Sequence, residues 1–335
     1  MSFISFGEVM LRLVPEKAGI KLASANAFQV GFAGSESNVA SSLALLGNPA
    51  AFVTKLPLNP VGEAALASLN SFGIDTSRIV RGGSRIGTYF IELGSSIRPS
   101  QVVYDRQGSA ISDIAEGEFD WEQILKGKKW LFLSGITPAL SGQCAAETIK
   151  AAQVAGSLGV KVAFDMNYRR TLWKDASEAR RRFDQVLEHT DILFGNVGAL
   201  SDVYGFNSKA SSELDQTLEA AEFAANNFGL QHLAFTVREH PSATVNTVYA
   251  MYQAPSGRAT SNPIEVVITD RFGAGDAFAA AFLHALNKEW SAREAIEFAA
   301  AAFALKHTIA GDQHTSSEAE IRAVMEGHTK GHVLR

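Results

Sequence analysis

The sequence predicts an α/β protein with a mostly parallel central sheet, helices on both faces of that sheet, and a small antiparallel sheet outside it. Short apolar segments rich in β-branched residues alternate along the chain with longer segments of helical periodicity. The helical segments are long enough to serve as crossovers between parallel strands. Two segments, about 8–32 and 86–112, break this alternation and predict the second sheet.

The strands of the central sheet are expected where short apolar runs are bounded by turn residues. These runs are residues 2–6, 50–54, 130–133, 160–165, 192–194, 233–237 and 265–268. Helices are expected over residues 37–46, 62–72, 143–158, 176–188, 213–228, 274–286 and 292–309. Ligands of such sheets bind at the carboxyl ends of the strands, so the chemistry is expected there.

The two inserted segments are expected to form a lid over that edge of the sheet. Residues 8–32 leave no room for a full crossover helix, whereas 88–93 and 101–106 alternate as the arms of a hairpin. The loop between the arms contains Gly94, which favours a turn. Because no repeat or long linker divides the chain, residues 1–335 are expected to form one domain.

Composition excludes several classes of protein. The chain has 335 residues, 46% of them hydrophobic, with a net charge of −5, so no polyanion-binding surface is expected and nucleic acid is not an expected partner. Cys144 is the only cysteine, which excludes an internal disulfide and suits a reducing compartment. Glu8 and Arg12 interrupt the N-terminal apolar run, so neither a signal peptide nor a membrane span is expected. These features favour a cytoplasmic protein.

The stretch 268–285 carries the strongest chemical signal. An apolar β-type run that includes Val267 is expected to be a buried strand, and Gly273-Ala274-Gly275 ends it and opens a helix. The free amides and positive dipole of such a helix start can hold a phosphate, and Asp276 lies in the first turn. A simpler interpretation makes Asp276 a helix cap.

Two other phosphate-binding motifs fit this chain poorly. A dinucleotide fingerprint would need a glycine where Phe278 stands, and it normally lies near the start of its domain. The chain contains no Gly-x-x-x-x-Gly-Lys-[Ser/Thr] sequence, which excludes a P-loop.

A second glycine-containing stretch, residues 31–38, precedes an expected helix. Gly34 would let the backbone approach a ligand closely, while Ser35 and Asn38 could hydrogen-bond a sugar hydroxyl. Taken alone, the stretch is equally typical of a loop with a helix cap.

The two stretches together resemble the two signatures of the ribokinase/PfkB sugar-kinase family, in the family's order and at its separation. The resemblance covers essentially the whole chain, including the inserted lid strands. Asp-Arg at 270–271, followed by Phe-Gly-Ala-Gly-Asp at 272–276, is similar to the 2-keto-3-deoxygluconate kinase branch. Residues 165–169 and 304–308, with Gly-Asp following the latter, match the same branch.

The resemblance implies a ribokinase-like three-layer sandwich that uses ATP and Mg²⁺. It implies that Asp276 is the general base that takes the proton of the attacking hydroxyl. The N–H groups of Gly273, Ala274, Gly275 and Asp276 would stabilise the transferring phosphoryl group, and the helix start would favour the ionised form of Asp276. Mg²⁺ would be held mainly by phosphates and water, so no protein metal ligands are expected.

The resemblance also implies which residues contact a sugar acid. Arg106 and Arg169 would bind the carboxylate, because a guanidinium can donate two parallel hydrogen bonds to it. The other expected substrate contacts are Gly34, Ser35, Asn38, Tyr89, Tyr104 and Asp312. The alternatives are a surface ion pair for each arginine and ordinary sheet packing for the two tyrosines.

A further set of residues is expected on the nucleotide side. This set contains Asn167, Asn196, Thr236, Arg238, Gly273, Gly275, Lys306 and His307, with the last two bordering the adenine site. Three departures from the family pattern occur here and in the first signature. The glutamate of Asn-x-x-Glu is missing after Asn196, residues 236–240 replace a glycine-rich loop, and Phe32 stands at a usual glycine.

The function expected from the sequence is ATP-dependent phosphorylation of 2-keto-3-deoxy-D-gluconate at its terminal hydroxyl. One alternative is a kinase for a neutral ketose such as fructose or for another keto-deoxy acid. The other is a sugar-binding regulator that has lost turnover, although retention of Asp276 argues against it. A homo-oligomer formed through the lid is expected, because exposed sheet edges commonly pair.

Overall fold

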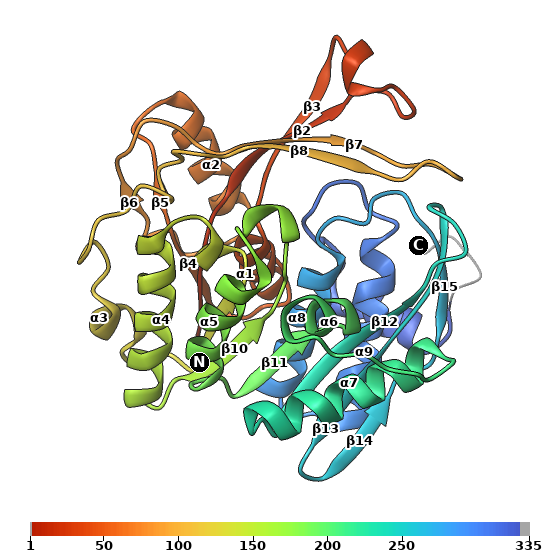
Figure 1. The fold of residues 1–335 in the computed structure, drawn as a ribbon. Helices are drawn as coiled ribbons and strands as arrows, with labels where there is room; N and C mark the ends of the chain where they lie inside the picture. The colour runs from red at the N-terminus through yellow and green to blue at the C-terminus, as the bar shows by residue number, and fades with distance from the viewer. Residues whose placement is uncertain (1, 329–335) are drawn as a thin grey trace.

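The computed structural model describes residues 2–328, and its strands form one large sheet beneath a smaller one (Figure 1). Strands of the large sheet lie in the order β14-β13-β12-β11-β10-β9-β1-β4, with β15 paired to β13. All neighbours from β4 to β12 are parallel, and β13 is antiparallel to its three partners. The bounds are β1 Phe3–Phe6, β4 Ala50–Val53, β9 Trp130–Ser134, β10 Lys161–Asp165, β11 Ile192–Gly195, β12 His232–Glu239, β13 Val245–Ala254, β14 Gly257–Thr260 and β15 Ile264–Val267.

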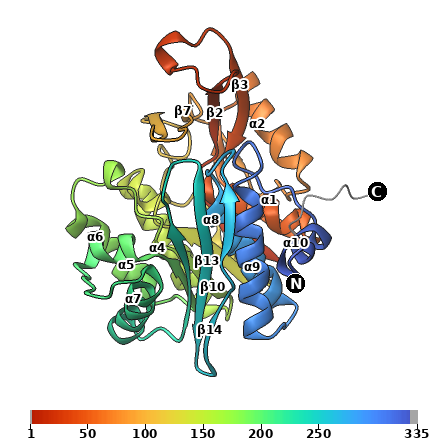
Figure 2. The ribbon, with the colours of Figure 1, turned by 90° about the vertical axis from the view of Figure 1, so that its right-hand side faces the viewer.

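Helices cover both faces of this sheet, as Figure 2 shows from the side. One face carries α3 Trp121–Leu125, α4 Gly142–Ser157, α5 Ala176–Leu187, α6 Val197–Tyr204 and α7 Glu213–Phe228. The other carries α1 Ser35–Leu45, α8 Ala274–Asn287, α9 Ala292–Lys306 and α10 Glu318–Met325, while α2 Pro60–Ser71 lies toward the smaller sheet. Short 3₁₀ helices span Leu22–Ser24, Thr137–Ala139 and Arg170–Leu172.

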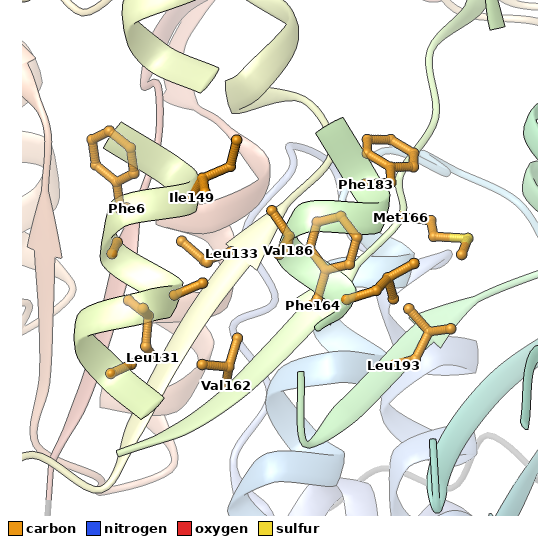
Figure 3. Packing of buried hydrophobic residues seen from close by; sticks show 14 of the residues in the cluster. Phe6, Leu131, Leu133, Ile149, Val162, Phe164, Met166, Phe183, Val186 and Leu193 are labelled. Carbon is orange, nitrogen blue, oxygen red and sulfur yellow. The ribbon is translucent and has the colours of Figure 1, made fainter. Parts of the chain in front are cut away.

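The central strands are apolar on both faces because both faces are covered. Side chains alternate along β9, so that Leu131 and Leu133 pack under α4 and α5 while Trp130 and Phe132 pack on the opposite side. Figure 3 shows the first of these layers, where Leu133 lies near Ile149 of α4. The resulting core holds the carboxyl ends of the strands in fixed positions.

The smaller sheet, called the lid sheet below, lies above one edge of the main body in Figure 1. Its strand order is β3-β2-β7-β8, with bounds β2 Met10–Pro15, β3 Phe28–Ala33, β7 Thr88–Glu92 and β8 Gln101–Asp105. The β2–β3 and β7–β8 pairs are antiparallel, whereas β2 and β7, which come from the two separate insertions, pair in parallel. A further short parallel pair joins β5 Lys55–Leu56 to β6 Val80–Arg81.

The α/β class with a mostly parallel sheet and a small second sheet is confirmed, but one strand assignment was wrong. Residues 265–268 do not form a buried central strand, because β15 pairs only with β13, in antiparallel orientation. Val267 accordingly has 63% of its surface exposed. The β13–β14 hairpin and the helices α3, α6 and α10 were not expected.

Within residues 2–328, no helix combines the length and the apolar character needed to cross a membrane.

Candidate active site

One cavity of about 660 Å³ lies between the lid sheet and the carboxyl ends of the central strands. It brings together residues from both glycine-containing stretches, the lid and three strand ends. The expected site residues that line it are Gly34, Ser35, Asn38, Tyr89, Tyr104, Arg106, Asn167, Arg169, Asn196, Thr236, Arg238, Gly273, Ala274, Gly275, Asp276 and Asp312.

The start of α8 forms a cradle of amides in the cavity wall. Gly273 has a φ of 75°, and a Cβ there would lie 1.8 Å from the main-chain oxygen of Asp312, so only glycine fits. Helix α8 begins at Ala274, and the amide of Ala277 donates to the Gly273 oxygen at 2.9 Å. The preceding N–H groups of the first turn have no intrahelical acceptor and can hold an anion.

Asp276 is buried at the base of this cradle and joins α8 to α1. Its carboxylate accepts hydrogen bonds from Ser35 Oγ at 2.6 Å and Asn38 Nδ2 at 2.7 Å. Asn167 Nδ2 in turn donates to Ser35 Oγ at 2.9 Å. Burial raises the pKa of Asp276, while the bonds from Ser35 and Asn38 oppose that rise, so burial outweighs the factors that favour the charged form. A raised pKa suits a carboxylate that must accept a proton.

Two further carboxyl groups lie near Asp276, the buried Glu36 and the half-buried Asp165, and neither was among the expected site residues. Burial raises the pKa of Glu36 to about 7, against hydrogen bonds from Ser134 and Thr137, each 2.6 Å long. Burial, followed by repulsion from Asp276, raises the pKa of Asp165 to about 7 as well. The surroundings of Asp276 therefore favour the protonated form of these acids more than water does.

The raised pKa of Glu36 predicts a pH dependence of stability. In the unfolded chain Glu36 titrates near 4.5 and in the folded chain near 7, so the folded state binds more protons between these values. The free energy of unfolding therefore falls as pH rises from about 4.5 to about 7. Glu36→Gln is expected to remove about 1–3 kcal/mol of this fall, since one pKa unit corresponds to about 1.4 kcal/mol.

Urea unfolding at pH 5 and pH 8 measures this difference. Glutamine can still accept both hydroxyl hydrogen bonds through its amide oxygen, so the comparison isolates the titration. Glu116→Gln, at an exposed glutamate, is the matched control and should keep the wild-type difference between the two pH values. A Glu36→Gln protein with the full wild-type difference would contradict the assignment.

Arg106 is held from behind by an internal ion pair. Its Nε donates to Glu8 Oε2 at 2.8 Å, and Ser109 Oγ donates to Glu8 Oε1 at 2.6 Å. Arg106 and Glu8 are both buried, so this pair is not the surface ion pair considered as the alternative. The guanidinium also lies 5.4 Å from the centroid of the Tyr104 ring. Glu8 thereby fixes the orientation of the Arg106 guanidinium at the cavity wall.

Arg169 has a different environment. It is exposed, lines the cavity in the loop that follows β10, and makes no ion pair within residues 2–328. Its charge opposes the rise in the pKa values of Asp165 and Asp276, although it forms no ion pair with either carboxylate. Of the two expected carboxylate-binding arginines, Arg169 is thus the one with its full hydrogen-bonding capacity available.

Asp312 belongs to a buried charge network that connects the lid to the main body. Tyr89 of β7 donates its hydroxyl to Asp312 Oδ2 at 2.9 Å and stacks on Tyr104 with the ring centroids 6.1 Å apart. Arg12 of β2 pairs with Asp312 at 2.5 Å and also contacts Asp270. Burial raises the pKa of Asp312 to about 6, against the effect of Arg12.

Lys306 and His307 do not border the cavity, contrary to the sequence-based prediction. Both side chains are fully buried, because the last turn of α9 packs beneath the loop that carries Asp270. Lys306 Nζ donates to the main-chain oxygen of Ile309 at 2.9 Å and to that of Asp270 at 3.4 Å. His307 Nδ1 hydrogen-bonds the main-chain oxygen of Phe303 at 2.6 Å.

Asn196 lines the cavity and also caps a helix that the sequence did not predict. Its Oδ1 accepts from the amide of Ala199 at 3.0 Å, at the start of α6. The side-chain oxygen of Asn196 therefore stabilises the start of α6. No group of three or more histidine, cysteine, aspartate or glutamate side chains within residues 2–328 is placed to hold a metal ion.

Several charged residues of the site were missed by sequence reasoning, although each carries a recognisable local signal. Glu8 and Arg12 interrupt an apolar run, and Glu36 stands among small residues in a buried helix. Charged side chains at buried positions require a partner. The signal marks each residue as unusual, but its partner lies far away in the sequence.

An amide cradle at a helix start, beside a buried carboxylate in a covered cavity, is the arrangement that phosphoryl transfer requires. The amides can stabilise the transferring group, and the carboxylate can accept the proton of the attacking hydroxyl. The α/β fold and this cavity together define the class of protein as a phosphotransferase acting on small molecules.

Comparison with known proteins gives the family within this class. The model of the pfkB family carbohydrate kinases matches residues 2–319. A 2-dehydro-3-deoxygalactonokinase of Haloferax volcanii is 32% identical over 98% of both chains. The crystal structure of a 2-dehydro-3-deoxygluconokinase from Thermotoga maritima is 41% identical, covers 98% of both chains and superposes with a TM-score of 0.94. A putative 2-keto-3-deoxygluconate kinase from Enterococcus faecalis is 30% identical, with a TM-score of 0.91 over 100% of this chain and 99% of that one.

The chain belongs to the PfkB family of carbohydrate kinases. It is a carbohydrate kinase similar to 2-dehydro-3-deoxygluconokinases, and kinases of this family use ATP with Mg²⁺.

Proposed function

We propose that this kinase transfers the γ-phosphoryl group of ATP to the terminal hydroxyl of 2-keto-3-deoxy-D-gluconate, giving the 6-phosphate and ADP. The observation that carries this proposal is the position of Asp276, which lies in the first turn of α8 at the amide cradle and is held by Ser35 and Asn38. A pure sugar-binding regulator would need no base at this position. The keto-deoxy acids named for the relatives above support this class of substrate.

In the proposed reaction, Asp276 accepts the proton of the C6 hydroxyl as that oxygen attacks the γ-phosphorus. The bond between the γ-phosphorus and the bridging oxygen breaks, and that oxygen leaves on ADP. The amides of Gly273, Ala274 and Gly275 stabilise the charge on the transferring group. Ser35 and Asn38 fix the carboxylate so that its orientation toward the hydroxyl costs little further entropy.

The residues present fit ATP carrying Mg²⁺. The cavity supplies the amide cradle and Arg238 for phosphate oxygens. Mg²⁺ bound through phosphates and water needs no cluster of protein ligands, and its charge would offset that of the phosphate chain.

Arg169 is the residue that favours an acid over a neutral sugar. Its guanidinium is free of carboxylate partners in the described part of the chain and faces the same cavity as Asp276. A carboxylate of the substrate could bind it with two parallel hydrogen bonds. Arg106, held by Glu8, would contribute through its remaining N–H groups.

The test is a coupled ADP-release assay across a panel of sugars and sugar acids. 2-Keto-3-deoxygluconate is expected to give the highest kcat/KM, ahead of its galactonate epimer, 5-dehydro-2-deoxygluconate and fructose. A higher kcat/KM for the epimer would reassign the substrate to 2-keto-3-deoxygalactonate. A preference for fructose would reassign it to a neutral ketose. If no sugar in the panel led to ADP release, the remaining hypothesis would be a non-catalytic sugar-binding regulator.

Arg169→Met is expected to lower kcat/KM for the sugar acid by at least ~10²-fold, because the substrate carboxylate loses a charged partner. Weak activity with fructose should change far less. Arg170→Met is the matched control, since Arg170 lies next in sequence, is 78% exposed and pairs with Asp202. Equal losses for acid and ketose would remove Arg169 from substrate discrimination.

We also propose that the lid sheet pairs with a second copy of the chain. Val30 of β3 and Val103 of β8 are 64% and 54% exposed on the two edge strands of the lid sheet, and such edges commonly pair with another chain. Sedimentation velocity on the purified protein measures this association, and a monomer at micromolar concentration would contradict it.

A further inference from the structure

Two arginines on the nucleotide side of the cavity have no carboxylate partner. Arg238 lies near the end of β12, and Arg271 lies two residues before Gly273 of the cradle. Both line the cavity, and neither forms an ion pair within residues 2–328. Arg12 and Arg106, which are buried, each bind a carboxylate, whereas Arg238 and Arg271 are half-buried and, like Arg169, bind none.

Arg238 is oriented by neutral groups. Its Nη2 donates to His307 Nε2 at 3.1 Å, and its guanidinium lies 5.3 Å from the centroid of the Phe303 ring. Burial lowers the pKa of His307 to about 3, so the imidazole is neutral and can accept this bond. Its other nitrogen, Nδ1, donates to the main-chain oxygen of Phe303. The histidine therefore holds the guanidinium in place without cancelling its charge.

Arg271 is held in the same manner by an amide. Its Nη2 donates to Asn246 Oδ1 at 3.1 Å, and Asn246 is itself fully buried in β13. The Nε of Arg271 is buried without a hydrogen-bond partner. An unsatisfied donor on a charged group costs free energy, and this cost is relieved only when an acceptor arrives.

The two charges also act on each other. Burial, followed by repulsion from Arg271, lowers the pKa of Arg238 to about 10. Like charges in a partly buried site without anions oppose the folded state. A bound polyanion would offset this repulsion.

We propose that Arg238 and Arg271 form a clamp for the polyphosphate chain of the nucleotide, next to the amide cradle. Arg238 was expected from the sequence to contact a phosphate, whereas Arg271 had no assigned role. The inference rests on the proposed kinase function and assigns the charged contacts of its nucleotide. A guanidinium suits this task because it stays charged and matches the spacing of phosphate oxygens.

The test measures binding by isothermal titration calorimetry, with ADP, inorganic tripolyphosphate and adenosine as separate probes and no sugar present. Arg271→Met and Arg238→Met are each expected to weaken ADP and tripolyphosphate by at least ~10-fold, the effect of losing a hydrogen bond between charged groups. Adenosine affinity should change less than two-fold. Arg258→Met, at an exposed arginine on β14 that pairs with Glu222, should bind all three probes as the wild type does.

Arg271→Lys keeps the positive charge and changes the side chain less than methionine does. It replaces Arg271→Met in the test if the methionine variant does not fold. It should bind tripolyphosphate several-fold more weakly than the wild type, because it loses the forked geometry, yet more tightly than Arg271→Met where that variant folds. If Arg271→Met, or Arg271→Lys in its place, bound ADP and tripolyphosphate as tightly as the wild type, the clamp would be overturned and the kinase function would stand. If the wild-type protein bound neither ADP nor tripolyphosphate, both the arginine clamp and the proposed kinase function would be overturned.

Discussion

Replacing Asp276 with asparagine is expected to lower kcat by at least ~10²-fold with little effect on KM for the sugar. The loss follows from the proposed role of the carboxylate as general base, since an amide cannot take the proton of the attacking hydroxyl and general-base catalysis contributes about 10²–10⁴-fold. The fold should persist. An asparagine at 276 can accept from Asn38 through its oxygen and donate its NH₂ group to Ser35 Oγ, which also acts as an acceptor.

The measurement is steady-state kinetics by coupled ADP release, accompanied by thermal unfolding of both proteins. Asp184→Asn, on the exposed surface of α5, is the matched control and should retain wild-type kcat. If Asp276→Asn turned over at the wild-type rate, another group would have to be the base. A reduced melting temperature with unchanged turnover per folded molecule would mark Asp276 as structural.

Replacing Arg12 with methionine is expected to reduce the free energy of unfolding by about 3–5 kcal/mol at pH 8. Arg12 lies between Asp270 and Asp312, and the side chains of all three are less than 10% exposed. Removing the cation leaves two buried carboxylates that repel each other, which is the costly way to break a buried ion pair. Because Arg12 is in β2, the same change should loosen the contact between the lid sheet and the loop after α9.

Urea unfolding at pH 8 and pH 5 separates this charge effect from lost packing. Burial raises the pKa of Asp312 to about 6, so at pH 5 this carboxyl is mostly protonated and the loss should shrink. A packing defect would cost the same at both pH values. Arg180→Met, which removes an exposed i,i+4 pair with Asp184, is the control and should cost no more than about 0.5 kcal/mol.

Much of the fold could be predicted because the signals for its elements are local. Helix α7 spans 213–228 as expected, and the hairpin of β7 and β8 lies within one residue of its expected arms. By contrast, β15 was misassigned because a run of β-branched residues does not reveal how many neighbours a strand has. The β13–β14 hairpin was missed for a related reason, since short β-type runs give weak periodicity.

The candidate site could be predicted mainly from its two glycine-containing stretches, and the structure brings them into one cavity. What could not be predicted is how its charged groups pair. Ser35 and Asp276 are 241 residues apart, and Arg12 and Asp270 are 258 apart. No local pattern specifies such a contact. Lys306 and His307 were placed at the cavity for the same reason, although the packing of α9 buries them.

The sequence by itself determined the α/β architecture, the lid and the chemistry of the cradle, because hydrophobic period, glycine positions and helix starts act over a few residues. Only the tertiary structure decided which carboxyl groups have a raised pKa. It also decided which arginines pair with a carboxylate and which have no carboxylate partner. Those properties depend on burial and on partners from distant segments, and both exist only once the chain is folded.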